Sequence, residues 1–446
     1  MSDFKQREAE ASKLRKNGKF KEALKIYREL WEAHEEDFDK WATWNYAKCA
    51  QKCGHHEEAD QIARHCHHEW PDFDLGNQVL AWSHYYRFFQ GDSDDGKSRT
   101  SDYWKAAEEV VSLCEKDPYS KYSPFARILF SVVKELEDRP STQENTEKRL
   151  EWLGHMDPDN LNAQADSYRD NSGKRRVVAS DRENWYSHMS KALLDAKRHE
   201  ECIQLCEEAL QRIRQLHYDN DVWFSTRIAK SKAALGRTEE AIADLKEVVL
   251  QKPEWHIYKE IATLAYQLKQ YDDALRYGAE AALGHGPLFF KWELFLLMAV
   301  VLRAKDEGSM AKEHAYLSAR IRGEKGWSIK GRTKELFSEF GVDAQSGPPP
   351  KELAQALKKE WKEWTREMLP RQEGVIDWVH HEKPFGFIKV DEQDDSIYFQ
   401  TRSFDGTEEQ CTGGTRVQFY VKESYDKKKD KMSTEAVEVE PSIQPD

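Results

Sequence analysis

The sequence is poor in glycine and proline and has no long apolar run. It holds 22 glycines and 14 prolines among 446 residues, which excludes collagen-like and low-complexity chains. The longest apolar stretch, Leu294–Leu302, has nine residues, whereas a helix that crosses a bilayer needs about 20. The first residues, Met1–Lys5, also lack the apolar segment of a secretory signal. We therefore expect a folded, helix-rich protein of the cytoplasm with no membrane partner.

The sequence lacks both a disulfide framework and a surplus of positive charge. Its seven cysteines are scattered from Cys49 to Cys411, so reduced thiols are the expectation. The 81 acidic side chains outnumber the 68 basic ones, and the formal net charge is −13. This charge argues against a protein that binds duplex DNA through its overall attraction to phosphate. A local nucleic-acid surface remains compatible with the sequence.

The familiar signatures of catalysis are missing as well. We find no phosphate-binding glycine loop, dinucleotide fingerprint, nucleophile elbow or HExxH motif. Residues 49–68 gather cysteines and histidines, among them Cys49, Cys53 and His55, and thiolate and imidazole groups are zinc ligands. Their spacing contains no CxxC and no regular HxxxH pair, which favours packing over metal binding. We expect a protein that is not an enzyme and that holds neither metal nor cofactor.

An internal repeat is present in the first three quarters of the chain. Small residues recur where a second helix follows a short turn, with a glycine five residues earlier in three cases and a proline twelve residues later in three cases. Neighbouring steps of 33 to 37 residues are typical of arrays of helix pairs. Glycine permits the turn, and a small residue lets two helices approach closely. The recurring small residues are Ala23, Ala59, Ala106, Cys202, Ala241, Ala274 and Ala311.

These repeats resemble tetratricopeptide repeats, as in Gly18–Tyr27 and Tyr271–Leu275. The resemblance covers most of residues 4–320 and is poor over 72–180, where loops near 91–96 and 140–143 interrupt the helices. It implies a superhelical array whose first helices line a concave face for a protein or peptide partner. The alternative for the tryptophans is packing between repeats. The partner contacts that the resemblance implies are Trp41, Trp44, Lys48, Trp223, Arg227, Lys230, Lys259 and Tyr266.

A basic segment separates the repeats from the C-terminal part. Between Arg320 and Lys334, basic side chains outnumber the single acidic one, and three glycines and Trp327 are interleaved. Such a segment either follows a phosphate backbone or balances acidic neighbours. The pattern of 351–369 predicts an amphipathic helix that caps the repeats. The expected divisions are 1–71 and 181–320 for regular repeats, 72–180 for irregular ones, 321–372 for the hinge and capping helix, 373–440 for a β-module and 441–446 for a tail.

From Gly374 onward, apolar and polar residues alternate, with many β-branched and aromatic side chains. Five short runs of this kind, near 375–378, 385–390, 397–399, 417–421 and 436–439, predict the strands of a small barrel. In Phe385–Phe387, two rings project from one face because side chains alternate along a strand. Exposed rings in this arrangement form a platform for unpaired bases.

The order of these motifs closely resembles a cold-shock domain of the OB-fold type over 374–440. The resemblance implies that the rings of Trp378, Phe385, Phe387 and Tyr398 stack on bases. It also implies that Lys383 and Lys389 steer phosphates and that Gln400, where the family usually has histidine, reaches a base edge. Three lysines of the last hairpin add positive charge beside them, namely Lys427, Lys428 and Lys429.

The sequence thus predicts a mostly α-helical chain: a tetratricopeptide-like α-solenoid followed by a small five-stranded OB-type barrel. The expected function is a non-enzymatic adaptor. The barrel binds single-stranded nucleic acid, RNA in preference to DNA, and the repeats bind a protein or peptide partner. The alternative is a purely protein–protein scaffold with a degenerate barrel, as in a bacterial stress or defence complex.

Overall fold

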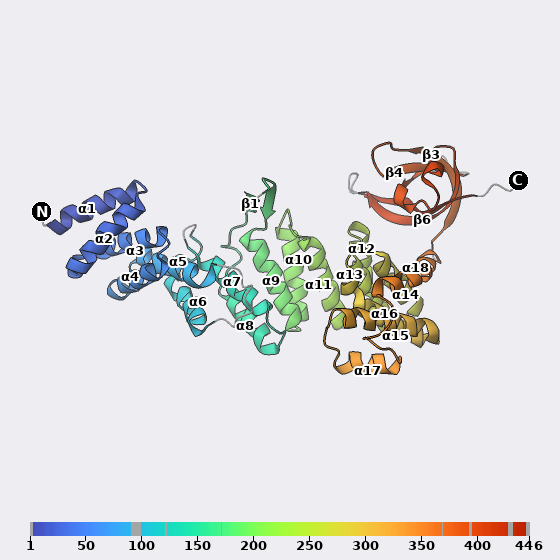
Figure 1. The fold of residues 1–446 in the computed structure, drawn as a ribbon, viewed down its shortest axis with the longest axis horizontal. Coiled ribbons are helices and arrows are strands. Elements are labelled where there is room, and N and C mark those ends of the chain that lie inside the picture. The colour runs from blue at the N-terminus through green and yellow to red at the C-terminus, as the bar shows by residue number, and fades with distance from the viewer. Residues whose placement is uncertain are drawn as a thin grey trace. The chain divides into compact units, whose positions relative to one another are not determined.

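The computed structural model describes residues 3–90, 100–120, 123–170, 172–367, 369–391, 395–426 and 431–442. The chain divides into two compact units, Met1–Phe224 and Ser225–Asp446. Helices fill the first unit and most of the second, and the strands of the barrel follow at the C-terminal end of the chain (Figure 1). The predicted architecture of helix pairs followed by a five-stranded barrel is confirmed.

The first unit consists of short helices and one β-hairpin. Helix α11 (Asn220–Ala234) contains the boundary with the second unit. The other elements are α1 (Asp3–Lys16), α2 (Phe20–His34), η1 (Glu35–Asp37), α3 (Lys40–Lys52), α4 (His56–Glu69), α5 (Asp74–His84), the π-helix η2 (Tyr85–Phe89), α6 (Ser101–Leu113), α7 (Phe125–Glu137), α8 (Gln143–Gly154), β1 (Asp166–Arg169), β2 (Arg175–Val178), α9 (Asp181–Asp195) and α10 (His199–Arg212).

The second unit continues the helix pairs and ends in the barrel. Its helices are α12 (Thr238–Gln251), α13 (Trp255–Gln267), α14 (Tyr271–Leu283), η3 (Leu288–Lys291), α15 (Trp292–Ala304), α16 (Gly308–Glu324), α17 (Gly331–Glu339) and α18 (Pro350–Arg366). Its strands and short turns are β3 (Arg371–Val379), β4 (Phe385–Val390), β5 (Ser396–Gln400), η4 (Thr401–Ser403), η5 (Glu408–Gln410), β6 (Arg416–Asp426) and β7 (Lys431–Pro441).

The turns within the helix pairs share one backbone conformation. In six pairs, the residue five positions before the recurring small residue has a left-handed φ between 59° and 84°. Glycine adopts this conformation freely, whereas other L-residues pay a steric cost. The small residues themselves are at most 2% exposed, so their predicted packing role is confirmed. The six turn residues are Gly18, Gly54, Lys197, Gly236, Lys269 and Asp306.

Residues 72–180 depart from the regular repeat. The loop expected near 91–96 lies outside the described residues, while residues 138–142 connect α7 to α8 as expected. Between α8 and α9 the chain forms the antiparallel hairpin β1–β2, in which Tyr168 lies opposite Arg176. The sequence interpretation placed no strands here. Nearly all side chains of the hairpin are exposed, so these strands lack the periodic burial pattern from which a strand can be predicted.

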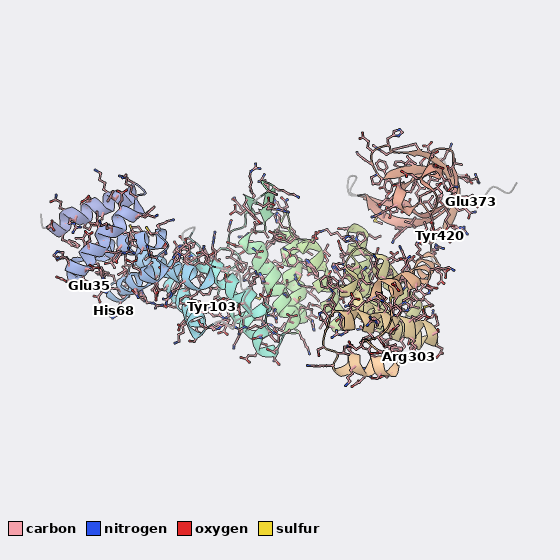
Figure 2. All side chains as sticks on the ribbon, viewed as in Figure 1. Glu35, His68, Tyr103, Arg303, Glu373 and Tyr420 are labelled. Atoms are coloured by element: carbon pink, nitrogen blue, oxygen red, sulfur yellow. The ribbon has the colours of Figure 1, made fainter. Side chains whose placement is uncertain are left out.

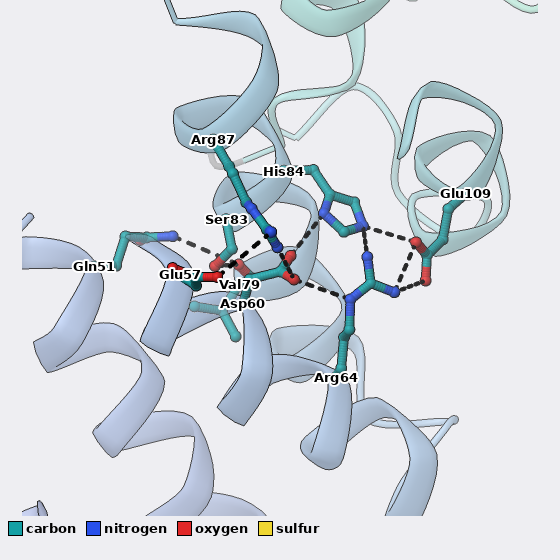
Figure 3. A network of polar contacts seen from close by, with 9 residues as sticks. All are labelled: Gln51, Glu57, Asp60, Arg64, Val79, Ser83, His84, Arg87 and Glu109. Carbon is teal, nitrogen blue, oxygen red and sulfur yellow. Dashed lines mark hydrogen bonds and ion pairs between the residues drawn. The ribbon is translucent and has the colours of Figure 1, made fainter. Parts of the chain in front are cut away.

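A buried polar network joins α4, α5 and α6 in this irregular region (Figure 3). The imidazole of His84 is fully buried, with Nδ1 2.9 Å from Asp60 Oδ1 and Nε2 2.8 Å from Glu109 Oε2. The guanidinium groups of Arg64 and Arg87 also contact Asp60, at 3.0 and 2.9 Å. The buried charges of Asp60 and His84 thus have opposite partners, which offsets the cost of removing them from water.

The barrel closes in the order β3-β4-β5-β7-β6, with β6 returning to β3. All neighbours are antiparallel except β5 and β7. Inward side chains alternate with outward ones along β4 and β5, as the sequence predicted, whereas the pairings of β3 with β4 and of β6 with β7 contain register shifts. The core contains Ile376, Ile388, Val390, Ile397, Phe399, Val417, Phe419, Ala436 and Val439.

Two sets of contacts connect the barrel with the helices of its own unit. Arg366, the last residue of α18, pairs with Glu438 on β7, and its guanidinium lies 5.7 Å from the ring of Tyr420 (labelled in Figure 2). Lys422 on β6 pairs with Glu280 on α14 at 2.6 Å. Burial opposes the charge of Lys422, but Glu280 outweighs this and raises the pKa of the lysine. These contacts involve β6 and β7.

Among the described residues, no helix combines the length and the apolarity that a bilayer crossing requires.

Candidate nucleic-acid interface

Three neighbouring strands bring aromatic rings into one row on the outside of the barrel. Phe387 on β4 lies directly opposite Trp378 on β3 and Tyr398 on β5. Its ring centroid is 5.2 Å from that of Trp378 and 5.9 Å from that of Tyr398. Phe385 lies 5.7 Å from both Trp378 and Tyr398. These four rings, which we call the ring face, are the ones that the sequence singled out, and the structure brings them together.

A β-bulge explains why Trp378 points outward. Ile376 is fully buried, and strict alternation would place Trp378 on the same inner face. The pairing shifts between these residues, however, because Ile376 faces Ile388 whereas Trp378 faces Phe387. Asp377 is the extra residue on β3, and an extra residue reverses the side on which the next side chain emerges. The bulge therefore adds the indole to the ring face.

Gly386, between the two phenylalanines of β4, is required by close packing. A Cβ at this position would lie 2.6 Å from the ring of Phe399 and 2.6 Å from the backbone oxygen of Trp378. Any side chain here would push β4 away from β3 or displace a core ring. The glycine thus lets the sheet carry large rings outside while the core stays tightly packed.

His380 belongs to the same ring cluster, although the sequence interpretation missed it. Its ring lies 5.1 Å from Phe385 and 6.4 Å from Trp378. Nδ1 accepts the backbone N–H groups of Glu382 and Lys383 at 3.0 and 3.2 Å, which fixes the loop before β4. The sequence could have identified it, because His380 follows Trp378 by two residues. Beyond the bulge, side chains two residues apart lie on the same face.

The ring face is open to water. Trp378 is 43% exposed, Phe385, Phe387 and Tyr398 are half-buried, and none of the four belongs to the barrel core. Burial and the nearby charge of Glu435 raise the pKa of Tyr398, so its hydroxyl stays protonated and able to donate. Gln400 is half-buried opposite Phe385 and supplies an amide at the edge of the rings. Flat rings bordered by an amide and a hydroxyl suit unpaired bases.

Positive charge is less prominent than aromatic rings on this surface. Lys383 and Lys389 are exposed, as predicted, but the acidic side chains of Asp377 and Glu382 are exposed nearby in sequence. Lys427, Lys428 and Lys429 lie outside the described residues. Lys389 stands on β4 between Val375 and Ser396 of the adjacent strands, next in line to Phe387 on the outer side. On this surface, aromatic rings are therefore a more prominent feature than positive charge.

In the first unit, the side chains predicted to bind a partner pack partly against their own helices. Trp41 is 49% exposed and meets Phe73 edge-on at 5.0 Å. Trp44 is half-buried beneath Arg15, 5.1 Å away. Lys48 donates to Gln51 at 3.1 Å, and burial lowers its pKa. Of the three predicted residues, Trp41 offers the most accessible surface.

Two of the basic side chains predicted on the first helices α11 and α13 form ion pairs. Lys230 on α11 pairs with Glu260 on α13 at 2.8 Å, and Lys259 on α13 pairs with Glu293 on α15. The ring of Tyr266 lies 6.1 Å from that of Tyr271. On α11, Trp223 is exposed and Arg227 is half-buried. The pairing of successive first helices reduces the free positive charge of this surface.

Several cysteines and histidines of residues 49–68 are buried or packed against aromatic rings. Within the part of the chain that the structure describes, no three His, Cys, Asp or Glu side chains are placed to share a metal ion. Cys49 is fully buried, and its burial raises the pKa of the thiol to about 12. His56 stacks on Tyr86 at 5.0 Å, and His65 meets Trp31 edge-on at the same distance.

Comparison with known proteins matches the barrel to a family. Residues 372–440 fit the model of the 'cold-shock' DNA-binding domain, so the resemblance predicted for 374–440 is confirmed. No curated protein matches the sequence.

Solved structures similar to this chain include tetratricopeptide-repeat proteins. One from Parabacteroides merdae has 10% identity and a TM-score of 0.30, and the match covers 68% of this chain and 100% of that one. The TPR2AB domain of yeast Sti1, in a complex with pHSP90, has 16% identity and a TM-score of 0.26 over 70% and 99%. BtubC from P. vanneervenii has 15% identity and a TM-score of 0.34 over 52% and 92%. Likenesses this distant say nothing about the partners of this chain.

Proposed function

We propose that this protein is a non-enzymatic adaptor whose barrel binds single-stranded nucleic acid by stacking bases on the ring face. The row formed by Trp378, Phe387 and Tyr398 across three strands carries the proposal. Bases of a single strand have flat faces to lay on these rings, whereas bases inside a duplex are already stacked. The match to the cold-shock domain family supports the same class of ligand. We expect RNA ahead of DNA, since recognition of RNA sequence mainly targets unpaired bases.

The helix pairs supply the second half of the adaptor. Trp41 and Trp223 keep large exposed surfaces, and aromatic anchors of this kind are favoured in protein interfaces. We therefore assign a protein or peptide partner to the helices. Because ion pairs occupy Lys230 and Lys259, apolar contact is the expected basis of that interaction.

The test measures binding of labelled RNA and DNA single strands to the full chain by fluorescence anisotropy. Replacing the central ring, Phe387→Ala, should weaken binding by about 1–3 kcal/mol, the usual contribution of one base–aromatic stack. Tyr168→Ala is the matched control, because this exposed ring lies on β1, outside the barrel. Equal affinity of the Phe387→Ala variant and the wild type for both strands would leave the protein–protein scaffold as the better account.

A further inference from the structure

A second cluster of exposed rings lies on the helical part of the second unit. Phe289 and Phe290 belong to η3, between α14 and α15, and Trp327 belongs to the loop between α16 and α17. The centroids of Phe289 and Phe290 are 4.3 Å apart, and Trp327 lies 6.4 Å from Phe289. Phe290 is 55% and Trp327 36% exposed. We call these three side chains the helical ring patch.

The backbone holds the patch in place. After α16, Gly326 has a φ of 64°, and the N–H of Trp327 donates to the carbonyl of Arg322 at 3.0 Å, which closes the helix end. In η3, the N–H of Phe290 donates to the carbonyl of Pro287 at 3.1 Å. Both ring-bearing segments therefore have a hydrogen-bonded backbone, and a cluster of large apolar rings exposed to water marks a candidate interaction surface.

Three lysines, Lys325, Lys330 and Lys334, lie within seven residues of Trp327 in the sequence. The ammonium group of Lys325 lies 4.3 Å from the ring centroid of Phe289. Among the described residues, Lys325, Lys330 and Lys334 form no ion pair with a carboxylate, and all three are exposed. Arg322 and Arg332, in contrast, are engaged with Ser328 and with Glu335, respectively. The three lysines are therefore available to an anion, and Lys325 is placed to contact one that also touches the rings.

We infer that the helical ring patch is a second contact site for single-stranded nucleic acid. This ligand combines a chain of phosphates with flat bases, and the patch offers Lys325 beside the rings, with Lys330 and Lys334 following Trp327 in the sequence. An acidic peptide would satisfy the lysines but leave most of the ring surface without a matching group. The inference rests on the proposed function, because it assigns the same class of ligand to a second surface of the chain.

The test compares a single strand of about 6 nucleotides with one of about 25 nucleotides, since one OB-type barrel covers about 4–16 nucleotides. The full chain carries Phe290→Ala with Trp327→Ala, and a second variant carries Lys325→Gln with Lys330→Gln. Leu235→Ala, at another exposed apolar position, is the control. The ring variant should lose about fivefold or more in affinity for the long strand and little for the short one. The lysine variant should reduce the slope of log K against log salt by about 1–2.

Wild-type affinity of both variants for the long strand would overturn the inference, and capture of a poly-glutamate peptide by the wild type but not by the variants would then identify a peptide site. A third variant, Phe385→Ala with Phe387→Ala, separates this inference from the proposed function. If this variant binds the short strand with the affinity of the wild type, the ring face is not a binding site and the proposed function is wrong. The affinity for the long strand tests the helical ring patch separately.

Discussion

The indole N–H of Trp361 donates to Nε2 of His314 at 2.8 Å, which joins α18 to α16. The other ring nitrogen of His314, Nδ1, lies 2.9 Å from the carbonyl oxygen of Met310 and donates to it. Trp361 also stacks on Phe295 of α15 at 5.4 Å. Because one nitrogen accepts and the other donates, the imidazole is neutral. Helix α18, which leads into the barrel, is thus held by a neutral histidine. Its Nε2 cannot take up a proton without losing the hydrogen bond from Trp361.

Acid should loosen this anchor. Burial lowers the pKa of His314 to about 4, whereas an unfolded histidine titrates near 6.5. The stabilisation is complete above about pH 6.5 and is lost as the pH falls towards 4, by about 3 kcal/mol at most. Hydrogen exchange of α16 and α18 at pH 7 and pH 4.5 measures this loss. His314→Gln should be less stable at pH 7 but less sensitive to acid, and an equal acid response in both proteins would contradict the account.

His84 should respond in the opposite direction. Burial disfavours its charge, but hydrogen bonds to Asp60 and Glu109 outweigh this and raise its pKa. Its stabilisation is therefore complete below about pH 6.5 and is lost as the pH rises through the raised pKa. We expect exchange in α4, α5 and α6 to speed up as the pH rises above about 6.5, after correction for the intrinsic rate. His84→Gln should remove most of this dependence, and a wild-type profile that stays flat over this range would refute the ion-pair network.

The turns within the helix pairs allow a test of backbone strain. Lys269 has a φ of 59°, and the left-handed region costs a non-glycine residue about 1–2 kcal/mol. Lys269→Gly should therefore stabilise the second unit by about 1 kcal/mol, after allowing for the flexibility of glycine in the unfolded chain. Gly236→Ala should destabilise it by a similar amount, although a Cβ there meets no atom within 4 Å. Urea denaturation measures both, and Lys269→Ala should be neutral if φ is the cause.

Gly386→Ala should damage the barrel and its ligand binding together. The added Cβ would lie 2.6 Å from both Phe399 and the backbone of Trp378, and overpacking of this kind costs about 1–3 kcal/mol. The loss of stability is measured by thermal unfolding of the chain and, for the barrel itself, by hydrogen exchange in β3 and β4. Ser396→Ala, at an exposed position of β5, is the control and should leave the barrel unchanged. A fully stable Gly386→Ala barrel would show that the sheet has more room than the contacts imply.

Most of the fold could be predicted from local patterns. The strand expected over 385–390 is β4 itself, and the helix expected over 351–369 is α18 within a few residues. The small residues of the repeats are buried because helix packing constrains their size at a fixed spacing. Three of the left-handed turn residues were missed, since Lys197, Lys269 and Asp306 replace the glycine that would have marked the turn.

Features that depend on distant contacts were not predictable. The segment expected as a hinge between 320 and 334 begins inside α16, where Arg320 donates to the distant carbonyls of Ala344 and Pro348. The ring face was predicted residue by residue, yet alternation alone would have turned Trp378 inward, and only the pairing of β3 with β4 reveals the bulge. The helical ring patch joins segments more than 30 residues apart.

Photocrosslinking tests the central claim most directly. A single strand of RNA that contains 4-thiouridine is bound to the full chain and irradiated, and the labelled peptides are identified by mass spectrometry. We predict crosslinks at Trp378, Phe385, Phe387 and Tyr398, on the three strands that form the ring face. A strand that binds tightly and labels none of these four residues would contradict the account.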